Sequence, residues 1–312
     1  MLAEIGSHFQ VDGAFVSCER YTGGHINDTY FAEYRKDGRT RRYVHQRINT
    51  HVFRDAHALI QNVGSVTRHI RKKLEAREAP DIDRRVLRVI PTHAGSDLLE
   101  RDGEYWRTYA FVERTRTRLR VETPADAYGA ARAFGEFAAL LSDLPVSRLE
   151  ETIPGFHDTP ARVRALELAI DADAVERAGG AANEIALARR LRDLAPALNE
   201  LAQRESLPLR ATHNDTKITN VLFDEGTGEA VCVVDLDTVM PGLTLYDVGE
   251  MIRTGCTRAK EDEADAANVV VDPALLQSVL NGFSEGAGDL LTPAERASLV
   301  LAGRVLAFEN GV

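Results

Sequence analysis

The pattern of apolar and polar positions changes in character near residue 120. Before it, short segments rich in β-branched and aromatic residues alternate with turns, which is typical of strands. These segments are residues 14–21, 29–34, 42–48, 85–90 and 104–112. A longer segment, residues 55–74, instead repeats Leu59, Val63, Val66 and Ile70 at helical spacing. The first part of the chain is therefore predicted to be a sheet with one helix packed on it.

After residue 120 the pattern is mostly helical. Thr123-Pro124-Ala125-Asp126 combines an N-cap, a proline at the first helical position and an acid in the first turn. Thr292-Pro293-Ala294-Glu295 is a second such start, and its helix runs toward the C-terminus. Further helices are predicted over residues 158–172, 183–203, 244–253 and 273–283. The expected fold class is α+β, with a mainly antiparallel β N-terminal lobe and a mainly α C-terminal lobe.

Length, charge and cysteine usage narrow the class of protein. The 312 residues suffice for two lobes with separate cores. A net charge of −10 without an extended basic block argues against a nucleic-acid partner. Cys18, Cys232 and Cys256 are odd in number and far apart, which favours reduced thiols and a cytoplasmic location. We find no secretory signal pattern and no apolar run near the roughly 20 residues that span a bilayer, so no membrane partner is expected.

The strongest chemical signal is a polar loop followed by an apolar strand. The loop reads His213-x-Asp215-x-x-x-x-Asn220, and a Val-Cys-Val-Val strand then leads to Asp235 and Asp237. Kinase-like phosphotransferases use this pattern to place a base and two magnesium ligands around a γ-phosphate. Asp215 is predicted to accept the proton of an acceptor hydroxyl. Asn220 and Asp235 would supply hard oxygen ligands to Mg²⁺.

Other interpretations of these residues stay open. Asp235 taken alone reads as a turn residue or helix cap. His213 is more readily explained as a brace for the loop backbone than as a catalytic group. A metallohydrolase is less favoured because only three or four candidate ligands cluster and no second histidine follows nearby.

The fold implied by this loop is a bilobal, protein-kinase-like one. Its lobes are predicted to be residues 1–113, which bind the nucleotide, and residues 114–312, which carry the catalytic loop and the substrate. The segment containing Phe111, Val112 and Glu113 lies where such a fold crosses between lobes. Its backbone groups are expected to hydrogen-bond adenine.

Several segments carry a resemblance to a known family. They are Gly24-His-Ile-Asn-Asp-Thr-Tyr30, Tyr43 to Asn49, Phe156 to Pro160, His213 to Lys217, and Val234 to Gly242. On these motifs the chain resembles the aminoglycoside phosphotransferase and choline kinase superfamily over nearly its whole length. The Gly-His-Ile-Asn, Asp-Thr-Lys and Asp-Leu-Asp-Thr-Val-Met-Pro-Gly segments are the more selective ones. They resemble the N-acetylhexosamine 1-kinase group of anomeric sugar kinases.

The resemblance implies a role for each loop acid and amide. It makes Asp215 the base and a contact of the acceptor, and it gives Asn220 and Asp235 to magnesium. Asp237 would belong to the same metal site and would hold the two metal ligands in place.

The resemblance also implies a role for the first hairpin. Gly23 and Gly24 would let the backbone approach the triphosphate closely, although these glycines alone read equally well as an ordinary hairpin turn. His25 and Asn27 are similar to residues that such kinases direct at the sugar. For His25 the alternative is a surface histidine.

The chain departs from the usual kinase pattern at one strand. Kinases commonly pair a strand lysine with the nucleotide phosphates, whereas the corresponding strand here reads Tyr43-Val-His-Gln46-Arg47. Gln46 or Arg47 is expected to serve instead. Members of the similar group also continue past the position of Val312, so part of the sugar pocket is expected to lie beyond it.

The function implied is ATP-dependent phosphorylation of the anomeric hydroxyl of a hexose, with ATP and Mg²⁺ as cofactors. N-acetylglucosamine and N-acetylgalactosamine are the leading acceptors. One alternative is another small-alcohol kinase, acting on an aminoglycoside, choline or homoserine. A second is a nucleotide-binding pseudokinase, which the missing lysine favours and the intact Asp215, Asn220 and Asp235 oppose.

Overall fold

The structure is a computed structural model that describes residues 2–23, 26–259 and 263–312. Contacts within the chain divide it into two compact units. The first unit comprises the chain up to Arg116 together with Asp143–Ile153 and Leu222–Met240. The second comprises Thr117–Ser142, Pro154–Val221 and Pro241–Val312. The segment that carries Asp235 thus belongs to the first unit, and the loop that carries Asp215 belongs to the second.

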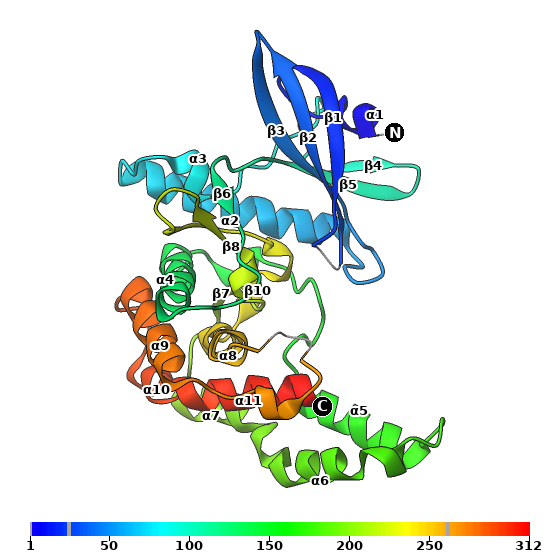
Figure 1. Cartoon of the computed structure of the whole chain (residues 1–312), viewed down its shortest axis with the longest axis vertical. Helices are drawn as coiled ribbons and strands as arrows, with labels where there is room; N and C mark the ends of the chain where they lie inside the picture. The colour runs from blue at the N-terminus through cyan, green and yellow to red at the C-terminus, as the bar shows by residue number, and fades with distance from the viewer. Residues whose placement is uncertain (1, 24–25, 260–262) are drawn as a thin grey trace. The chain divides into compact units, whose positions relative to one another are not determined.

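The first unit is built on a five-stranded antiparallel sheet with the strand order β1-β2-β3-β5-β4 (Figure 1). Its strands are β1 (Ala14–Tyr21), β2 (Asp28–Lys36), β3 (Arg39–Arg47), β4 (Leu99–Arg101) and β5 (Glu104–Ala110). Successive side chains of a strand point to opposite faces, so Tyr43 and His45 of β3 are buried on the same face of the sheet. On that face the core contains Phe9, Tyr34 and Trp106. The predicted strands 14–21, 29–34, 42–48 and 104–112 are confirmed.

The strand predicted over residues 85–90 is wrong. Residues Ile82–Arg85 form a short helix, α3, and after it Val89 makes a single isolated bridge to Tyr109. After α3, two backbone hydrogen bonds join the segment to β5. They are made by the Arg88 carbonyl and the Ile90 amide, with N···O distances of 2.9 and 2.8 Å. Apolar residues packed beside a sheet edge give the same sequence pattern as a strand.

The helices of the first unit are α1 (Leu2–Gly6), α2 (Ala56–Ala76) and α3. Asp55 caps α2 by accepting a hydrogen bond from the Ala58 amide at 2.9 Å. The four apolar residues predicted at helical spacing are all buried, as expected. The sequence pattern did not predict α1, which contributes Ile5 to the core of the sheet.

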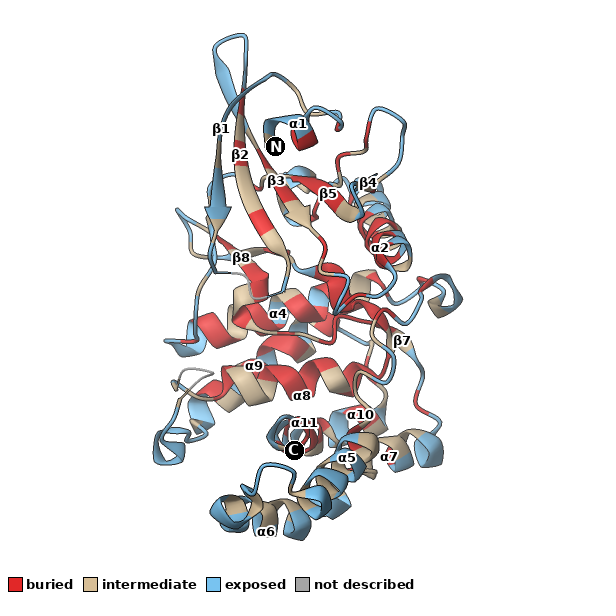
Figure 2. Ribbon diagram, turned by 90° about the vertical axis from the view of Figure 1, so that its right-hand side faces the viewer, coloured by how far each residue is buried: buried red, intermediate tan, exposed pale blue. Residues whose placement is uncertain are grey.

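The second unit is mainly helical. Its α-helices are α4 (Pro124–Leu140), α5 (Thr159–Ala172), α6 (Ala182–Leu191), α7 (Ala197–Glu205), α8 (Thr244–Gly255), α9 (Pro273–Ala287), α10 (Pro293–Ala297) and α11 (Leu299–Gly311). Helices α4, α8, α9 and α11 carry most of the buried positions, whereas α5 and α6 are largely exposed (Figure 2). Both predicted starts are confirmed as capping boxes, at Thr123 and at Thr292.

Two predicted helices are interrupted. The helix expected over residues 183–203 is divided into α6 and α7 because Pro196 has no amide to donate and clashes with the preceding turn. The helix that begins at Pro293 breaks at Ser298, where φ is −112°, and restarts as α11. The mainly β and mainly α division predicted for the two parts of the chain is otherwise confirmed.

Shorter strands and 3₁₀ turns position the polar loops. β6 (Thr115–Arg116), β8 (Val221–Asp224) and β9 (Ala230–Val233) form one sheet, and β7 (Arg210–Thr212) pairs with β10 (Met240–Gly242). The 3₁₀ turns are η1 (Val146–Arg148), η2 (Ala178–Ala181), η3 (Arg192–Leu194), η4 (Ile218–Asn220), η5 (Leu236–Thr238) and η6 (Ala266–Asn268). No helix of the described residues is long and apolar enough to cross a bilayer.

Candidate active site

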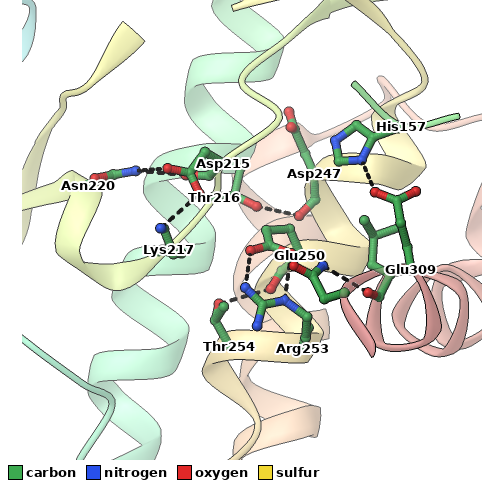
Figure 3. A network of polar contacts seen from close by, with 12 residues as sticks. His157, Asp215, Thr216, Lys217, Asn220, Asp247, Glu250, Arg253, Thr254 and Glu309 are labelled. Carbon is green, nitrogen blue, oxygen red and sulfur yellow. Dashed lines mark hydrogen bonds and ion pairs between the residues drawn. The ribbon is translucent and has the colours of Figure 1, made fainter. Parts of the chain in front are cut away.

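The loop after β7 brings Asp215, Lys217 and Asn220 together (Figure 3). The Asn220 side-chain amide donates to the Asp215 backbone carbonyl at 2.8 Å and to its Oδ2 at 3.0 Å. The Lys217 Nζ lies 3.1 Å from Asp215 Oδ1. The side chain of Asp215 is 26% exposed, so its carboxylate is accessible to solvent while Asn220 holds one of its oxygens.

A buried carboxylate on α8 anchors this loop. Asp247 accepts the backbone amides of His213 and Asn214, at 3.0 and 2.7 Å, one on each carboxylate oxygen. Asn214 has a φ of 64°, the left-handed region that a residue with a side chain rarely adopts. Burial raises the pKa of Asp247, although His213 and the two amides act to lower it. Asp247 was not predicted from the sequence, where its signal is an acid among the apolar residues that begin a helix.

His213 lies in the interior of the second unit. Its ring meets Phe134 and Phe137 edge-on, with centroid distances of 5.2 and 5.7 Å. The Asp215 amide donates to His213 Nδ1 at 3.3 Å. These contacts brace the loop backbone and set the direction of the Asp215 side chain.

The segment from Phe156 to Pro160 is tied to the C-terminal helix. The Glu309 carboxylate of α11 lies 2.8 Å from His157 Nδ1 and accepts the Thr159 hydroxyl at 2.6 Å (Figure 3). Burial acts to raise the pKa of Glu309, but His157, Thr159 and Arg162 together outweigh it and the pKa is lowered. The ring of His157 stacks on Tyr246 at a centroid distance of 4.5 Å. These contacts hold the start of α5 against α8 and α11.

Asp235 and Asp237 of the first unit have opposite environments. Asp235 is exposed and has a φ of 58°, whereas Asp237 lies in η5 and is 2% exposed. The Arg107 Nη2 donates to Asp237 Oδ2 at 2.8 Å, and its Nη1 forms an ion pair with Oδ1 at 2.5 Å that lacks hydrogen-bond geometry. The side-chain amide of Asn27 donates to the same carboxylate at 2.6 Å.

These residues suit a magnesium site only in part. Asp235 offers an exposed carboxylate, and Asn220, whose nitrogen is bound to Asp215, offers its amide oxygen. The Asp237 oxygens are already bound by Arg107 and Asn27. Within the described residues no three His, Cys, Asp or Glu side chains gather as a metal-binding group. A magnesium ion held by Asp235 or Asn220 would therefore complete its shell with other oxygens, such as those of phosphates.

The predicted contacts in the first hairpin are only partly described. Gly23 is exposed, and Gly24 and His25 lie outside the described residues. Both polar ends of the Asn27 side chain contact the protein, because its oxygen accepts the Asn49 amide at 2.9 Å while its nitrogen binds Asp237. Asn27 thus fastens the end of this segment to the first unit.

The two candidates for the missing strand lysine also have partners in the protein. Gln46 donates to the Thr29 hydroxyl at 2.9 Å and accepts from Arg107 at 3.0 Å. Arg47 pairs with Asp28 and, at 3.0 Å, with Glu104. Arg107 was not predicted to be buried, because the sequence of β5 reads the same whether this arginine faces the interior or the solvent.

The segment predicted to contact adenine has part of its backbone engaged. The Phe111 amide donates to the Arg42 carbonyl at 3.1 Å, and the Glu113 carbonyl accepts from Arg84 at 3.2 Å. The Val112 carbonyl accepts a threonine hydroxyl three residues further on. The contact of this segment with adenine stays a prediction.

The fold and the polar loop define a kinase-like phosphotransferase class. Residues 17–272 match the model of the APH family, described as the phosphotransferase enzyme family, and the chain belongs to this family. The match covers most of the chain. The superfamily predicted from the sequence motifs is therefore confirmed, while the N-acetylhexosamine 1-kinase group stays a prediction.

Solved structures share the fold at low sequence identity. Spectinomycin phosphotransferase, solved with ADP and spectinomycin, has a TM-score of 0.61 at 15% identity, covering 98% of this chain and 84% of that one. A microcompartment-associated aminopropanol kinase has a TM-score of 0.59 at 16% identity, covering 99% and 94%. Choline kinase from Cryptosporidium parvum has a TM-score of 0.54 at 13% identity, covering 99% and 85%. The predicted kinase-like α+β fold is confirmed.

Proposed function

We propose that the chain is an ATP-dependent kinase that phosphorylates the anomeric hydroxyl of a hexose to give the sugar 1-phosphate. N-acetylglucosamine and N-acetylgalactosamine are the first acceptors to test. The observation that carries the kinase part is the Asp215 carboxylate, which is partly exposed on a loop fixed by buried bonds. In phosphoryl transfer the protein mainly orients the acceptor and stabilises charge, and a rigid loop can orient the acceptor.

In this proposal Asp215 orients the acceptor hydroxyl and takes its proton. Asn220 holds Oδ2 of that carboxylate, and Lys217 lies beside Oδ1. An acceptor hydroxyl within hydrogen-bond reach of Asp215 would be aligned before transfer. The Lys217 ammonium would offset the negative charge gathered near the transferred phosphoryl group.

Asp235 and Asn220 would hold Mg²⁺, and Asp237 would support the turn that carries Asp235. Magnesium, when bound, would offset the charge of the ATP phosphates. The exposed Asp235 carboxylate supports the first role. The engaged carboxylate of Asp237 supports the second, since direct coordination would displace Arg107 or Asn27.

The charges beside an acceptor at Asp215 largely cancel, because the Lys217 ammonium lies 3.1 Å from the Asp215 carboxylate. The pair therefore gives no strong preference between a neutral and a cationic acceptor. The Gly-His-Ile-Asn and Asp-Thr-Lys motifs are what favours a hexose over an aminoglycoside or choline.

Two other functions have an observation in their favour. An amino-alcohol kinase is favoured by the aminopropanol kinase and choline kinase among the structures that share the fold. A nucleotide-binding pseudokinase is favoured by Gln46, which stands where kinases place a lysine.

The test is ADP release over a panel of hexoses, N-acetylhexosamines, aminoglycosides, choline and aminopropanol, with Asp215→Asn as the inactive control. We expect turnover with an N-acetylhexosamine. Phosphorus NMR of the product should show coupling to the anomeric proton. A 6-phosphate, or turnover with amino alcohols alone, would refute the anomeric assignment. Nucleotide binding without turnover on any acceptor would favour the pseudokinase.

A further inference from the structure

A buried arginine stands beside the position where kinases place their strand lysine. The register of β3 and β5 pairs Gln46 with Arg107. The Arg107 Nε donates to the Gln46 side-chain oxygen at 3.0 Å. A buried cation from the neighbouring strand therefore lies against Gln46.

Arg107 is not placed to contact phosphates. Its side chain is 1% exposed, and its terminal nitrogens are directed at the Asp237 carboxylate, whose side chain is 3% exposed. Burial acts to lower the pKa of Arg107, but Asp237, Tyr109 and Asp235 together outweigh it and the pKa is raised above its ordinary value. The guanidinium thus stays charged and bound to one carboxylate.

Asp237 connects two segments that the proposed function uses. The Asn27 side chain binds it from the end of the glycine-containing hairpin, at 2.6 Å. Its backbone carbonyl accepts the Thr152 hydroxyl at 2.9 Å. Two residues earlier, Asp235 holds its left-handed φ of 58°, a conformation that persists only where the surroundings fix it.

A purely stabilising role explains this pair poorly. Desolvation of two buried charges offsets most of their attraction, so replacing such a pair by apolar residues is often neutral or stabilising. What the pair provides is geometry, because a planar guanidinium that hydrogen-bonds one carboxylate oxygen and lies 2.5 Å from the other restricts the direction of the carboxylate.

We propose that Arg107 is a positioning residue of the active site, acting through Asp237 to hold the turn that presents Asp235. The proposal rests on the proposed function for the role of Asp235 as a magnesium ligand. Arg107 itself touches neither nucleotide nor acceptor. Its effect is carried by the carboxylate that it orients.

The experiment measures binding of ADP to the full chain by titration calorimetry, with and without Mg²⁺, for the parent and for Arg107→Lys. Lysine keeps the charge but cannot bind both Asp237 oxygens and Gln46 together. We expect the magnesium-dependent gain in ADP affinity to fall about tenfold or more, because a charge-assisted contact is lost, while ADP alone binds within about twofold of the parent. Arg101→Lys is the matched control, since Arg101 pairs with Glu4 on the edge strand β4 and should leave both values unchanged.

The outcomes separate this inference from the proposed function. Parent protein that gains no ADP affinity from Mg²⁺ would contradict both. If the parent gains affinity and folded Arg107→Lys gains it equally, the positioning role is refuted while the kinase proposal stands. Should Arg107→Lys fail to fold, the double variant Arg107→Gln with Asp237→Asn replaces it, because the neutral pair leaves no buried charge alone. That variant is expected to lose the magnesium-dependent gain, and retention of the full gain would overturn the proposal.

Discussion

Asp247→Asn should separate the anchoring of the catalytic loop from its chemistry. The substitution preserves the shape of the side chain but replaces one acceptor oxygen by an NH₂ group. One of the amides of His213 and Asn214, now bound at 3.0 and 2.7 Å, would then face a donor. Asp247 touches neither Asp215 nor the proposed ligands through its carboxylate, so any catalytic effect must pass through the loop backbone.

The magnitude follows from the two bonds and the burial of the charge. Losing one charge-assisted bond and leaving one buried amide unpaired should lower the free energy of unfolding by about 2–4 kcal/mol. Removing a buried charge offsets part of that loss, because burial raises the pKa of Asp247. The net loss of free energy of unfolding should be about 2 kcal/mol. Displacing the loop by a fraction of an ångström should lower kcat by about 10–100-fold.

The assays are urea unfolding and ADP release at saturating acceptor, both well below the unfolding midpoint. The KM for ATP should change little, because the loop carries the base rather than the adenine contacts. Asp272→Asn in the same unit is the control, since that N-cap accepts the Ala274 amide at 2.9 Å and asparagine caps as well as aspartate. A folded Asp247→Asn variant with parental kcat would refute the anchoring argument.

Four further predictions test other parts of the molecule. Asp215→Asn should lower turnover by about a hundredfold or more with ATP binding little changed, and turnover within about threefold of the parent would contradict the base assignment. Asp235→Ala should abolish turnover and weaken magnesium-dependent ATP binding in a titration; unchanged binding would remove Asp235 from the metal site. Gly282→Ala would bring a Cβ to 2.3 Å from a backbone oxygen of α4 and should cost about 1–3 kcal/mol in urea unfolding, whereas Gly311→Ala meets no atom within 4 Å and should not destabilise. Burial lowers the pKa of His45 from 6.5 to about 4, so the unfolded chain binds a proton first as pH falls from 6.5 toward 4. The free energy of unfolding should therefore drop by about 2 kcal/mol between pH 7 and 5. The His45→Gln variant should lack this component, and an unchanged pH slope in that variant would contradict the prediction.

The elements that the sequence predicted are those with a local signal. Segments rich in β-branched and aromatic residues between turns predicted β1, β2, β3 and β5, and the helical period predicted α2. Thr123 and Thr292 predicted helix starts because their hydroxyls satisfy amides three residues away. The residues of the catalytic loop were predicted for a similar reason, since Asp215 and Asn220 lie close together in the chain.

The features that the sequence did not predict depend on partners distant in the chain. Asp247 is recognisable as an anchor only when α8 is packed under a loop more than 30 residues earlier. Asn27 reads as a sugar contact from its motif, yet its side chain is engaged by Asp237, 210 residues away. Nothing in the local pattern around Arg107 marks it as a buried cation, because an arginine in an alternating strand is ordinarily exposed.

Asp235 and Asp237 show how environment divides roles between residues of one type. They are two positions apart, and a motif alone gives both to the metal. In the structure one carboxylate is exposed, and the other is buried with Arg107. If Asp237 turned to a metal ion, it would leave a buried guanidinium without its partner, at a cost of about 3–5 kcal/mol. We therefore propose that Asp235, which is the exposed one of the two, coordinates the metal and that Asp237 holds it in place.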